Sequence, residues 1–268
     1  MAASWARPLT GLFLGQRAYP AVLELQQRCA ALRKAGRIGD LALYLEHAPT
    51  ITLGRGSKAE HLLASEDRLR SLGVSLQTIN RGGDITLHAP GQLVAYPIVE
   101  LPPARRDVRR YVQSLTEVMR QVAAHYEIAS GTVEGYIGLW VDQDRPRHWQ
   151  GEAEATSLAK LGAIGVAISR WVTTHGFALN LTTNLTLFDL IVPCGIPEHP
   201  VTSIEALTGE TPTLHEAAEL AHTALAEQLS LEAKPLIDAT QIDIDQLLSD
   251  DEAICRLFQS FGTAVGFD

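Results

Sequence analysis

The sequence predicts an α+β protein with a mixed or antiparallel sheet and flanking helices. Many short strand-like segments are interspersed with a few helical ones, and the regular strand–helix alternation of a doubly wound sheet is absent after residue 126. The chain has 268 residues, of which 46% are hydrophobic and 20% are charged. It is therefore long enough to bury a large core, and its composition is neither disordered nor fibrous.

Helices are expected where apolar residues recur every three to four positions. In segment 19–36, Val22, Leu25 and Leu32 follow this spacing, and Pro20 suits a first helical turn. A long helix is expected to begin after the capping residue Asp107 and to run to residue 126. The remaining predicted helices are 59–72, 213–229 and 250–261.

Strands are expected where short apolar or alternating runs are bounded by turn residues. The predicted strands are 41–46, 50–53, 74–79, 93–99, 135–141, 158–168 and 171–181. The last two are expected to form a hairpin that turns at Ser169 and Arg170. A polar stretch without periodicity, 142–157, precedes this hairpin.

The charge is concentrated at one end of the chain. The net charge is −9, from 22 basic and 31 acidic residues, which excludes a generic nucleic-acid binder. Residues 211–268 hold two basic residues, Lys234 and Arg256, against eleven acidic ones, whereas 1–210 is neutral. This shift predicts a domain at 1–210, with 211–268 as an acidic, helical C-terminal extension packed on it.

Nothing in the sequence predicts a membrane or secretory location. No stretch approaches the roughly 18 apolar residues that a membrane span needs, and residues 1–10 lack the apolar core of a signal peptide. The three cysteines form no C-x-x-C pair, which is typical of a reducing compartment. We therefore expect a cytoplasmic protein.

Cys194 differs from the other two cysteines. Cys29 and Cys255 belong to apolar helical stripes and are interpreted as core residues, whereas Cys194 stands between Pro193 and Gly195. Those neighbours break regular structure and predict a turn that presents the thiol. The alternative is that Cys194 is only a small residue filling the turn.

Lys160 is one of four lysines and stands in an apolar, strand-like segment. Such a lysine either extends its ammonium to the surface or is kept for chemistry. A nearby ammonium favours the reactive thiolate of a cysteine, so a Cys–Lys pair suffices as nucleophile and base for acyl transfer. Whether Cys194 and Lys160 meet depends on the fold.

A glycine-rich segment, RGGDITLHAPGQ at 81–92, is a second candidate for binding. Gly82 and Gly83 allow a backbone to approach a ligand closely, although a plain strand connection is the alternative. The segment lacks the spacing of a phosphate loop. His88 and His175 have no partner at metal-binding spacing, so we expect no metal and no cofactor.

Four arginines surround the start of the long helix: Arg105, Arg106, Arg109 and Arg110. A basic patch of this kind suits an acidic protein partner, such as an acyl carrier protein. The alternative is a solvated helix start with no partner.

Taken in order, these motifs resemble those of the lipoyl(octanoyl) transferases. The matching segments span residues 19–207: LEHAP at 45–49 with TLGR at 52–55, RGG through HAPGQL at 81–93, K-x-GAIGV at 160–166, THGFALN at 174–180, and PCGI at 193–196 followed by VTSI. The four motifs from residue 81 onward, found in the same order, are a specific signal, and the earlier segment 45–55 also fits. The acidic tail lies outside the resemblance.

The resemblance implies the fold of biotin and lipoate protein ligases and an octanoyltransferase activity. Members of the family take an octanoyl group from octanoyl-acyl carrier protein onto a cysteine, which corresponds to Cys194. They then pass it to a lysine of the lipoyl domains of 2-oxoacid dehydrogenases or of the glycine cleavage H protein. The lysine of the family's catalytic pair corresponds to Lys160. No cofactor is implied.

By the same resemblance, substrate contacts fall on three segments, from which backbone amides near His88 and in 163–165 are expected to stabilise the oxyanion. These segments comprise Arg81, Gly82, Gly83, Asp84, Ile85, Thr86, Leu87, His88, Ala163, Ile164, Gly165, Gly176, Phe177 and Ala178. The chain departs from the family pattern at Asp84, at Ala89 and in the longer stretch 142–157.

Two other functions fit parts of the sequence. An ATP-dependent lipoate or biotin protein ligase shares the implied fold and uses a lysine, but it needs a nucleotide site and no cysteine nucleophile. A catalytically silent member would only bind lipoyl domains. The presence of both Cys194 and Lys160 favours the transferase.

Overall fold

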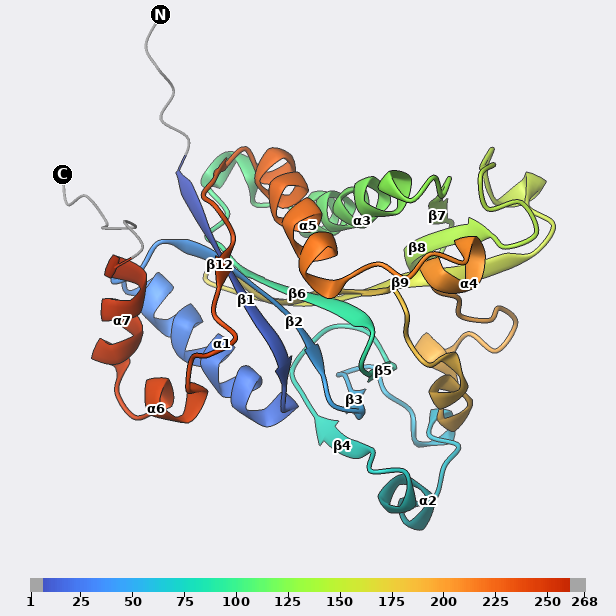
Figure 1. Cartoon of the computed structure of the whole chain (residues 1–268), viewed down its shortest axis with the longest axis horizontal. Coiled ribbons are helices and arrows are strands. Elements are labelled where there is room, and N and C mark those ends of the chain that lie inside the picture. Colours follow the sequence, from blue (N-terminus) through green and yellow to red (C-terminus); the bar gives the residue numbers. More distant parts are fainter. Residues whose placement is uncertain (1–6, 261–268) are drawn as a thin grey trace, which may run out of the picture.

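The computed structural model describes residues 7–260 and is built around a nine-stranded mixed sheet (Figure 1). The strand order is β11-β1-β2-β6-β10-β9-β8-β7, and β12 also pairs with β1. β1 runs parallel to β2, β11 and β12, whereas the other neighbours are antiparallel. The predicted α+β class with a mixed sheet is confirmed.

The strands of the main sheet are β1 (Pro8–Arg17), β2 (Asp40–His47), β6 (Gln92–Ile98), β7 (Gly131–Val133), β8 (Tyr136–Asp142), β9 (Leu158–Ser169), β10 (Val172–Asn180), β11 (Glu232–Ala233) and β12 (Ile237–Asp238). A second, three-stranded sheet has the order β4-β3-β5. Its strands are β3 (Thr50–Leu53), β4 (Ser75–Thr78) and β5 (Ile85–His88).

The α-helices are α1 (Tyr19–Lys34), α2 (Glu66–Ser71), α3 (Val108–His125), α4 (Ile204–Thr208), α5 (Leu214–Leu229), α6 (Ile244–Leu248) and α7 (Asp251–Ser260). Helix α3 begins as predicted, because the Asp107 side chain accepts a hydrogen bond from the Arg110 amide. Thr213 caps α5 in the same way.

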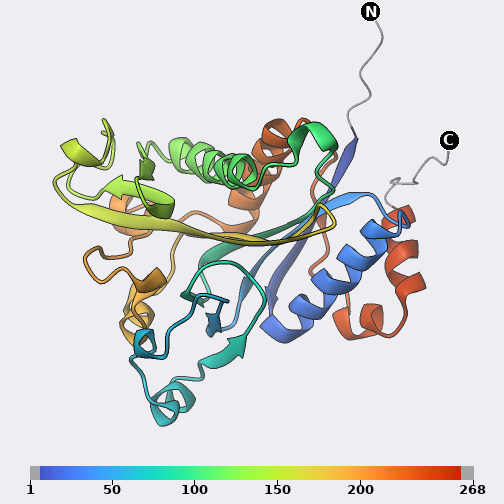
Figure 2. The same ribbon diagram turned by 180° about the vertical axis from the view of Figure 1, so that it is seen from behind.

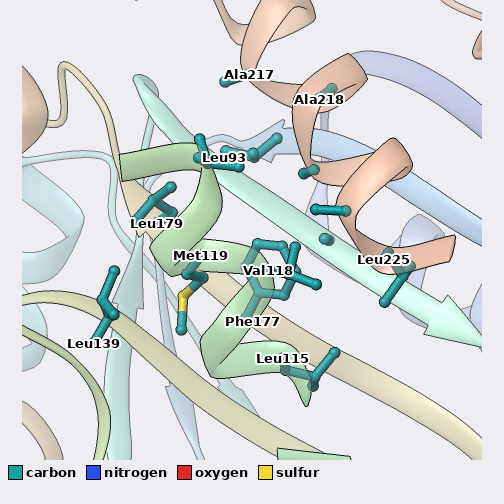
Figure 3. Close-up of a cluster of buried hydrophobic side chains, with 14 of the residues drawn as sticks. Leu93, Leu115, Val118, Met119, Leu139, Phe177, Leu179, Ala217, Ala218 and Leu225 are labelled. Carbon is teal, nitrogen blue, oxygen red and sulfur yellow. The ribbon is translucent and has the colours of Figure 1, made fainter. Parts of the chain in front are cut away.

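Helices cover both faces of the main sheet. Helices α3 and α5 lie on one face, and α1, α6 and α7 lie on the other (Figures 1 and 2). The alternation along β2 explains the two layers, since Ala42 and Tyr44 face α3 and α5 while Leu41 and Leu43 face α1. Figure 3 shows the core between the sheet and helices α3 and α5, in which Met119 of α3 packs near sheet residues.

The small sheet and α2 form a lobe below the main sheet (Figure 1). Its own core contains Ile51, Leu69, Ile85, Leu87 and Phe188. Strand β5 of this lobe lies within the glycine-rich segment 81–92, and the chain around Cys194 packs against β5. The lobe therefore brings two of the candidate segments together.

Most predicted elements agree with the structure to within a few residues, but the predicted helix 59–72 is wrong. The chain there forms a 3-10 helix, Ala59–His61, and the separate helix α2, because the Ser65 side chain caps a new start. Strand β1 was not predicted. It is buried on both faces, so its sequence shows no alternation. Phe261, predicted at the end of the last helix, lies outside the described residues.

The C-terminal segment contributes to both layers. Helix α5 packs beside α3, β11 and β12 extend the sheet next to β1, and α6 and α7 pack on α1. The two short strands add to the helices that were expected there.

Candidate active site

A cavity of about 520 Å³ lies along the part of β9 that β8 leaves unpaired. Strand β8 pairs with β9 only as far as Gly162, and Gly82 donates to the Val166 carbonyl four residues further on (2.9 Å). The cavity lies beside the backbone between these two points, at Ala163, Ile164 and Gly165. The glycine-rich segment and the turn of Cys194 complete its wall.

Cys194 lies on a tight turn at the cavity wall. The turn is a short 3-10 segment, Pro193–Gly195, in which Cys194 has left-handed backbone angles (φ 56°, ψ 17°). The Gly195 amide donates to the Val192 carbonyl at 3.0 Å. The thiol is half-buried, whereas the thiols of Cys29 and Cys255 are buried in the core. Burial raises the pKa of Cys29 to about 12, which makes it inert at neutral pH.

Lys160 lies next to this thiol. Its Nζ is 3.1 Å from the Cys194 Sγ and 5.2 Å from the centre of the Trp140 ring. The lysine is 5% exposed, so it does not extend to the surface. Its backbone is fixed on both sides, because its amide donates to Pro200 and its carbonyl accepts from Thr202, each at 2.9 Å.

Arg81 brings a buried positive charge to the cavity. Its Nη2 donates to the carbonyl and to the hydroxyl of Thr52, at 3.0 and 2.9 Å. No carboxylate forms an ion pair with it among residues 7–260, and burial lowers its pKa. The guanidinium can therefore stabilise negative charge that develops in the cavity.

The glycines on both sides of Arg81 allow this close packing. A side chain at Gly165 would meet the Arg81 side chain at 2.8 Å, and one at Gly54 would meet the Gly83 carbonyl at 2.5 Å. Gly82 and Gly83 both line the cavity, as the resemblance implies for substrate contacts.

Strand β5 divides the predicted contact residues between two sides. Thr86 and His88 line the cavity, whereas Ile85 and Leu87 are fully buried in the core of the small lobe. The reason is the alternation of side chains along a strand. The predicted substrate contacts of Ile85 and Leu87 are therefore not made by their side chains.

His88 is held in one tautomer by a buried network. Its Nδ1 lies 2.8 Å from the Gln92 Oε1, and the Gln92 amide donates to Leu87 and to Asn180. With that amide oriented as an acceptor toward His88, Nδ1 carries the proton and Nε2 keeps its lone pair. Burial lowers the pKa of His88 to about 3, so the ring is neutral at physiological pH.

Tyr19 and Tyr96 line another part of the cavity, and the sequence did not single them out. Tyr19 stacks on His88 with ring centres 5.7 Å apart, and the Tyr96 hydroxyl lies 2.9 Å from the Nε2 of His47. Burial raises the pKa of Tyr19 to about 12 and lowers that of His47 to about 4. The positions of Tyr19 on α1 and Tyr96 on β6 gave no local signal of a site.

His175 belongs to the THGFALN motif and also lines the cavity. The structure places it in the cavity wall on β10, with left-handed φ (57°) and its amide donating to the Gln26 side chain (2.9 Å). Its Nδ1 is buried without a hydrogen-bond partner, and burial lowers its pKa to about 4. Among the described residues, no group of three or more His, Cys, Asp or Glu side chains could hold a metal ion.

The other predicted contact residues lie together on β9 and β10. Ala163, Ile164, Gly176, Phe177 and Ala178 all line the cavity. A side chain at Gly176 would come within 2.1 Å of the Ala95 carbonyl, so glycine is required there by the spacing of β10 and β6.

The three departures from the family pattern have defined places. Asp84 lines the cavity and contacts His61, and Ala89 is buried in the core of the small lobe. The stretch 142–157 is organised by the buried Asp142 carboxylate, which accepts from the amides of Thr156 and Ser157 (both 3.1 Å). It is therefore an ordered loop.

The predicted basic patch is only partly available to a partner. Arg105 donates to the Gln228 carbonyl (2.9 Å), and Arg106 lies over the Trp171 ring. Arg109 and Arg110 are exposed beside Val108, which lines the cavity.

Among residues 7–260, no helix is long and apolar enough to cross a membrane.

An amine and a thiol in contact at a mostly apolar cavity, on this α+β sheet, are typical of an acyl-transferring enzyme. Residues 18–226 match the family model of the lipoyl protein ligase A/B catalytic domain. The chain therefore belongs to this family.

Relatives within the family are octanoyltransferases. The chain is 44% identical over 229 residues to the octanoyltransferase of Chloroflexus aurantiacus, covering 85% of this chain and 97% of that protein. It is also 44% identical over 206 residues to that of Solibacter usitatus, covering 77% and 86%. These relatives identify the chain as an acyltransferase enzyme.

Solved structures confirm the fold. A bipartite lipoate protein ligase from Thermoplasma acidophilum, studied with its E2 lipoyl domain, has a TM-score of 0.65 at 12% identity and covers 98% of this chain and 95% of its own. A lipoate-protein ligase A bound with ATP has a TM-score of 0.64 at 12% identity, covering 97% and 96%. At these identities the likeness concerns the fold alone.

Proposed function

We propose that the chain transfers an octanoyl group from octanoyl-acyl carrier protein to a specific lysine of a lipoyl domain, by way of a thioester on Cys194. The observation that carries the proposal is the 3.1 Å contact between the Cys194 Sγ and the Lys160 Nζ. The wall of the cavity is mostly apolar around this pair, which suits an acyl chain.

In the first half-reaction, Lys160 takes the thiol proton and the Cys194 sulfur attacks the thioester carbonyl. The carrier's thiolate leaves and receives the proton from Lys160. Arg81 and backbone amides at 163–165 are the proposed groups that stabilise the oxyanion, since both lie at the cavity.

In the second half-reaction, the amine of the acceptor lysine attacks the acyl-Cys194 carbonyl. Lys160 takes a proton from the attacking nitrogen, the amide forms, and the Cys194 thiolate leaves and receives that proton from Lys160. The acyl group is held as a thioester before each attack and is therefore already activated, so the steps need no nucleotide. We propose the lipoyl domains of 2-oxoacid dehydrogenases and the glycine cleavage H protein as acceptors.

Placement of the site supports a division of the chain. The residues that line the cavity all lie between Tyr19 and Ile196. We propose that 1–210 is the acyltransferase domain and that 211–268 is an acidic extension packed on it. The three unpaired cysteines support a cytoplasmic location.

Incubation with octanoyl-acyl carrier protein, followed by peptide mass spectrometry, tests the proposal. We expect one octanoyl adduct on Cys194 that is discharged by a lipoyl domain without ATP. Transfer that requires ATP would instead indicate a lipoate ligase. Binding of the lipoyl domain without any adduct would indicate a silent member of the family.

A further inference from the structure

The turn that carries Cys194 needs support from outside itself. Cys194 and Gly195 are consecutive left-handed residues, with φ of 56° and 68°. A non-glycine residue adopts this conformation only at a cost in free energy, so an unsupported turn would relax. Relaxation would move the Sγ of Cys194 away from Lys160.

His61 and Asp84 form a pair directly against this turn. The His61 Nδ1 donates to the Asp84 Oδ2 at 2.5 Å, and both side chains are more than four-fifths buried. A Cβ added to Gly195 would lie 2.7 Å from the Asp84 Oδ2 and 2.7 Å from the His61 Cε1. The pair therefore contacts the backbone of the residue that follows the nucleophile.

The same two residues are themselves firmly placed. The His61 carbonyl accepts from the Val192 amide (2.8 Å). Further along the same segment, the amides of Leu63 and Ala64 both donate to the Leu190 carbonyl. The other carboxylate oxygen of Asp84 accepts from the Ile85 amide at 2.7 Å, at the start of β5.

We propose that His61 and Asp84 are positioning residues that hold the Cys194 turn in its left-handed conformation, with the thiol against Lys160. The His61 backbone fixes the chain before the turn, and the His61–Asp84 pair supports the chain after it. The proposal rests on the proposed function only in taking Cys194 as the nucleophile.

The rate at which iodoacetamide alkylates Cys194 tests this without any acyl donor. Peptide mass spectrometry isolates the Cys194 signal, because Cys29 and Cys255 are buried. We expect His61→Ala and Asp84→Ala each to slow alkylation about tenfold, which corresponds to the cost of one strained residue. The double variant should be no slower than either single variant, because the pair acts as a unit.

His61→Asn is the conservative variant, since its side-chain amide can still donate to Asp84. It should recover most of the rate, whereas a loss of bulk packing alone would not be recovered. The matched control is His125→Ala, which removes an exposed histidine that also faces a carboxylate, Glu216, at 3.9 Å. Its alkylation rate should equal that of the wild type.

In the acyl-transfer assay, His61→Ala should lower kcat with little change in KM, because His61 does not line the cavity. Alkylation within twofold of the wild type in both alanine variants, measured on folded protein, would overturn the proposal. If the alanine variants do not fold, His61→Asn and Asp84→Asn decide. Both keep the hydrogen bond of the pair, so alkylation about tenfold slower than in the wild type in both variants would overturn the proposal. A wild type that alkylates normally but transfers no octanoyl group would contradict the proposed function alone.

Discussion

The Nζ of Lys160 lies 3.1 Å from the Sγ of Cys194, although 34 positions separate them in the sequence. Lys160 belongs to a central strand that is fixed by pairing, whereas Cys194 belongs to a turn. The thiol is thus held against an amine on a fixed strand, which is the arrangement that the proposed nucleophilic catalysis needs.

Lys160→Met should abolish most of the activity without unfolding the protein. Methionine fills similar space against Trp140 and removes a buried polar group, so we expect a Tm equal to or above that of the wild type. Loss of the base should slow acyl-enzyme formation by about 10²–10⁴-fold in single-turnover measurements. Lys234→Met, at an exposed lysine paired with Glu232, is the control. Retention of more than a tenth of the rate would contradict the role of Lys160.

Reversing the charge of Arg109 and Arg110 should weaken binding of the acyl donor. Both are exposed next to Val108 at the cavity, and an acidic carrier would be steered by them. We expect the double Glu variant to raise KM about tenfold at low salt, with kcat unchanged and the difference reduced at high salt. Arg68→Glu on α2 is the control. An equal KM in both variants would place the docking surface elsewhere.

Acidification should destabilise the protein through its buried histidines. Burial holds the pKa of His47 and of His175 at about 4, whereas an unfolded histidine binds its proton near 6.5. The unfolded state therefore binds more protons between these values, and stability falls as the pH drops from 6.5 toward 4. Each residue should cost about 2 kcal/mol of unfolding free energy at pH 5 relative to pH 7.

Urea unfolding at pH 7 and pH 5 measures this difference. The variant His175→Asn should reduce it by about 2 kcal/mol, since it removes one titrating group. His175 has no partner at Nδ1, so the substitution breaks no side-chain hydrogen bond there. The exposed His148→Asn should leave the difference unchanged. An unaltered difference in His175→Asn would show that this ring is protonated in the folded state.

Gly176→Ala should destabilise the fold far more than a glycine replacement on the surface. Its Cβ would lie 2.1 Å from the Ala95 backbone oxygen, between two central strands that cannot separate. We expect a loss of about 3 kcal/mol or more. Gly73→Ala meets no atom within 4 Å and suffers only from its positive φ, a cost of about 1 kcal/mol. Equal losses in denaturant unfolding would refute the steric argument.

Asp142→Asn should loosen the loop 142–157. Burial alone would raise the pKa of Asp142, but hydrogen bonds from Thr156, Arg145 and Ser157 lower it to about 2, so the carboxylate is the acceptor that organises the loop. We expect a loss of about 2 kcal/mol and faster hydrogen exchange of the Thr156 and Ser157 amides. Asp67→Asn on exposed α2 should change neither. Unchanged exchange would mean that the loop is held by other contacts.

Several elements were predictable because their signals are local. Helix α3 has a capping Asp107 and a continuous apolar stripe, and the β9–β10 hairpin joins two β-rich segments across a short turn, which lies at Arg170 and Trp171, one residue after the predicted position. Strand β1 could not be predicted, because a strand buried on both faces shows no alternation of polar and apolar residues. The start of α2 was predicted wrongly, because the capping residue Ser65 divides the segment 59–72.

The sequence by itself determined the kind of chemistry, since motif order and residue type identify a thiol and an amine without any geometry. Only the tertiary structure decided that Lys160 meets Cys194, that Ile85 and Leu87 turn away from the cavity, and that His61 lies against the turn of Cys194. Contacts of this kind join segments far apart in the chain. They depend on how strands pair and turns are supported, and no local pattern of residues encodes that.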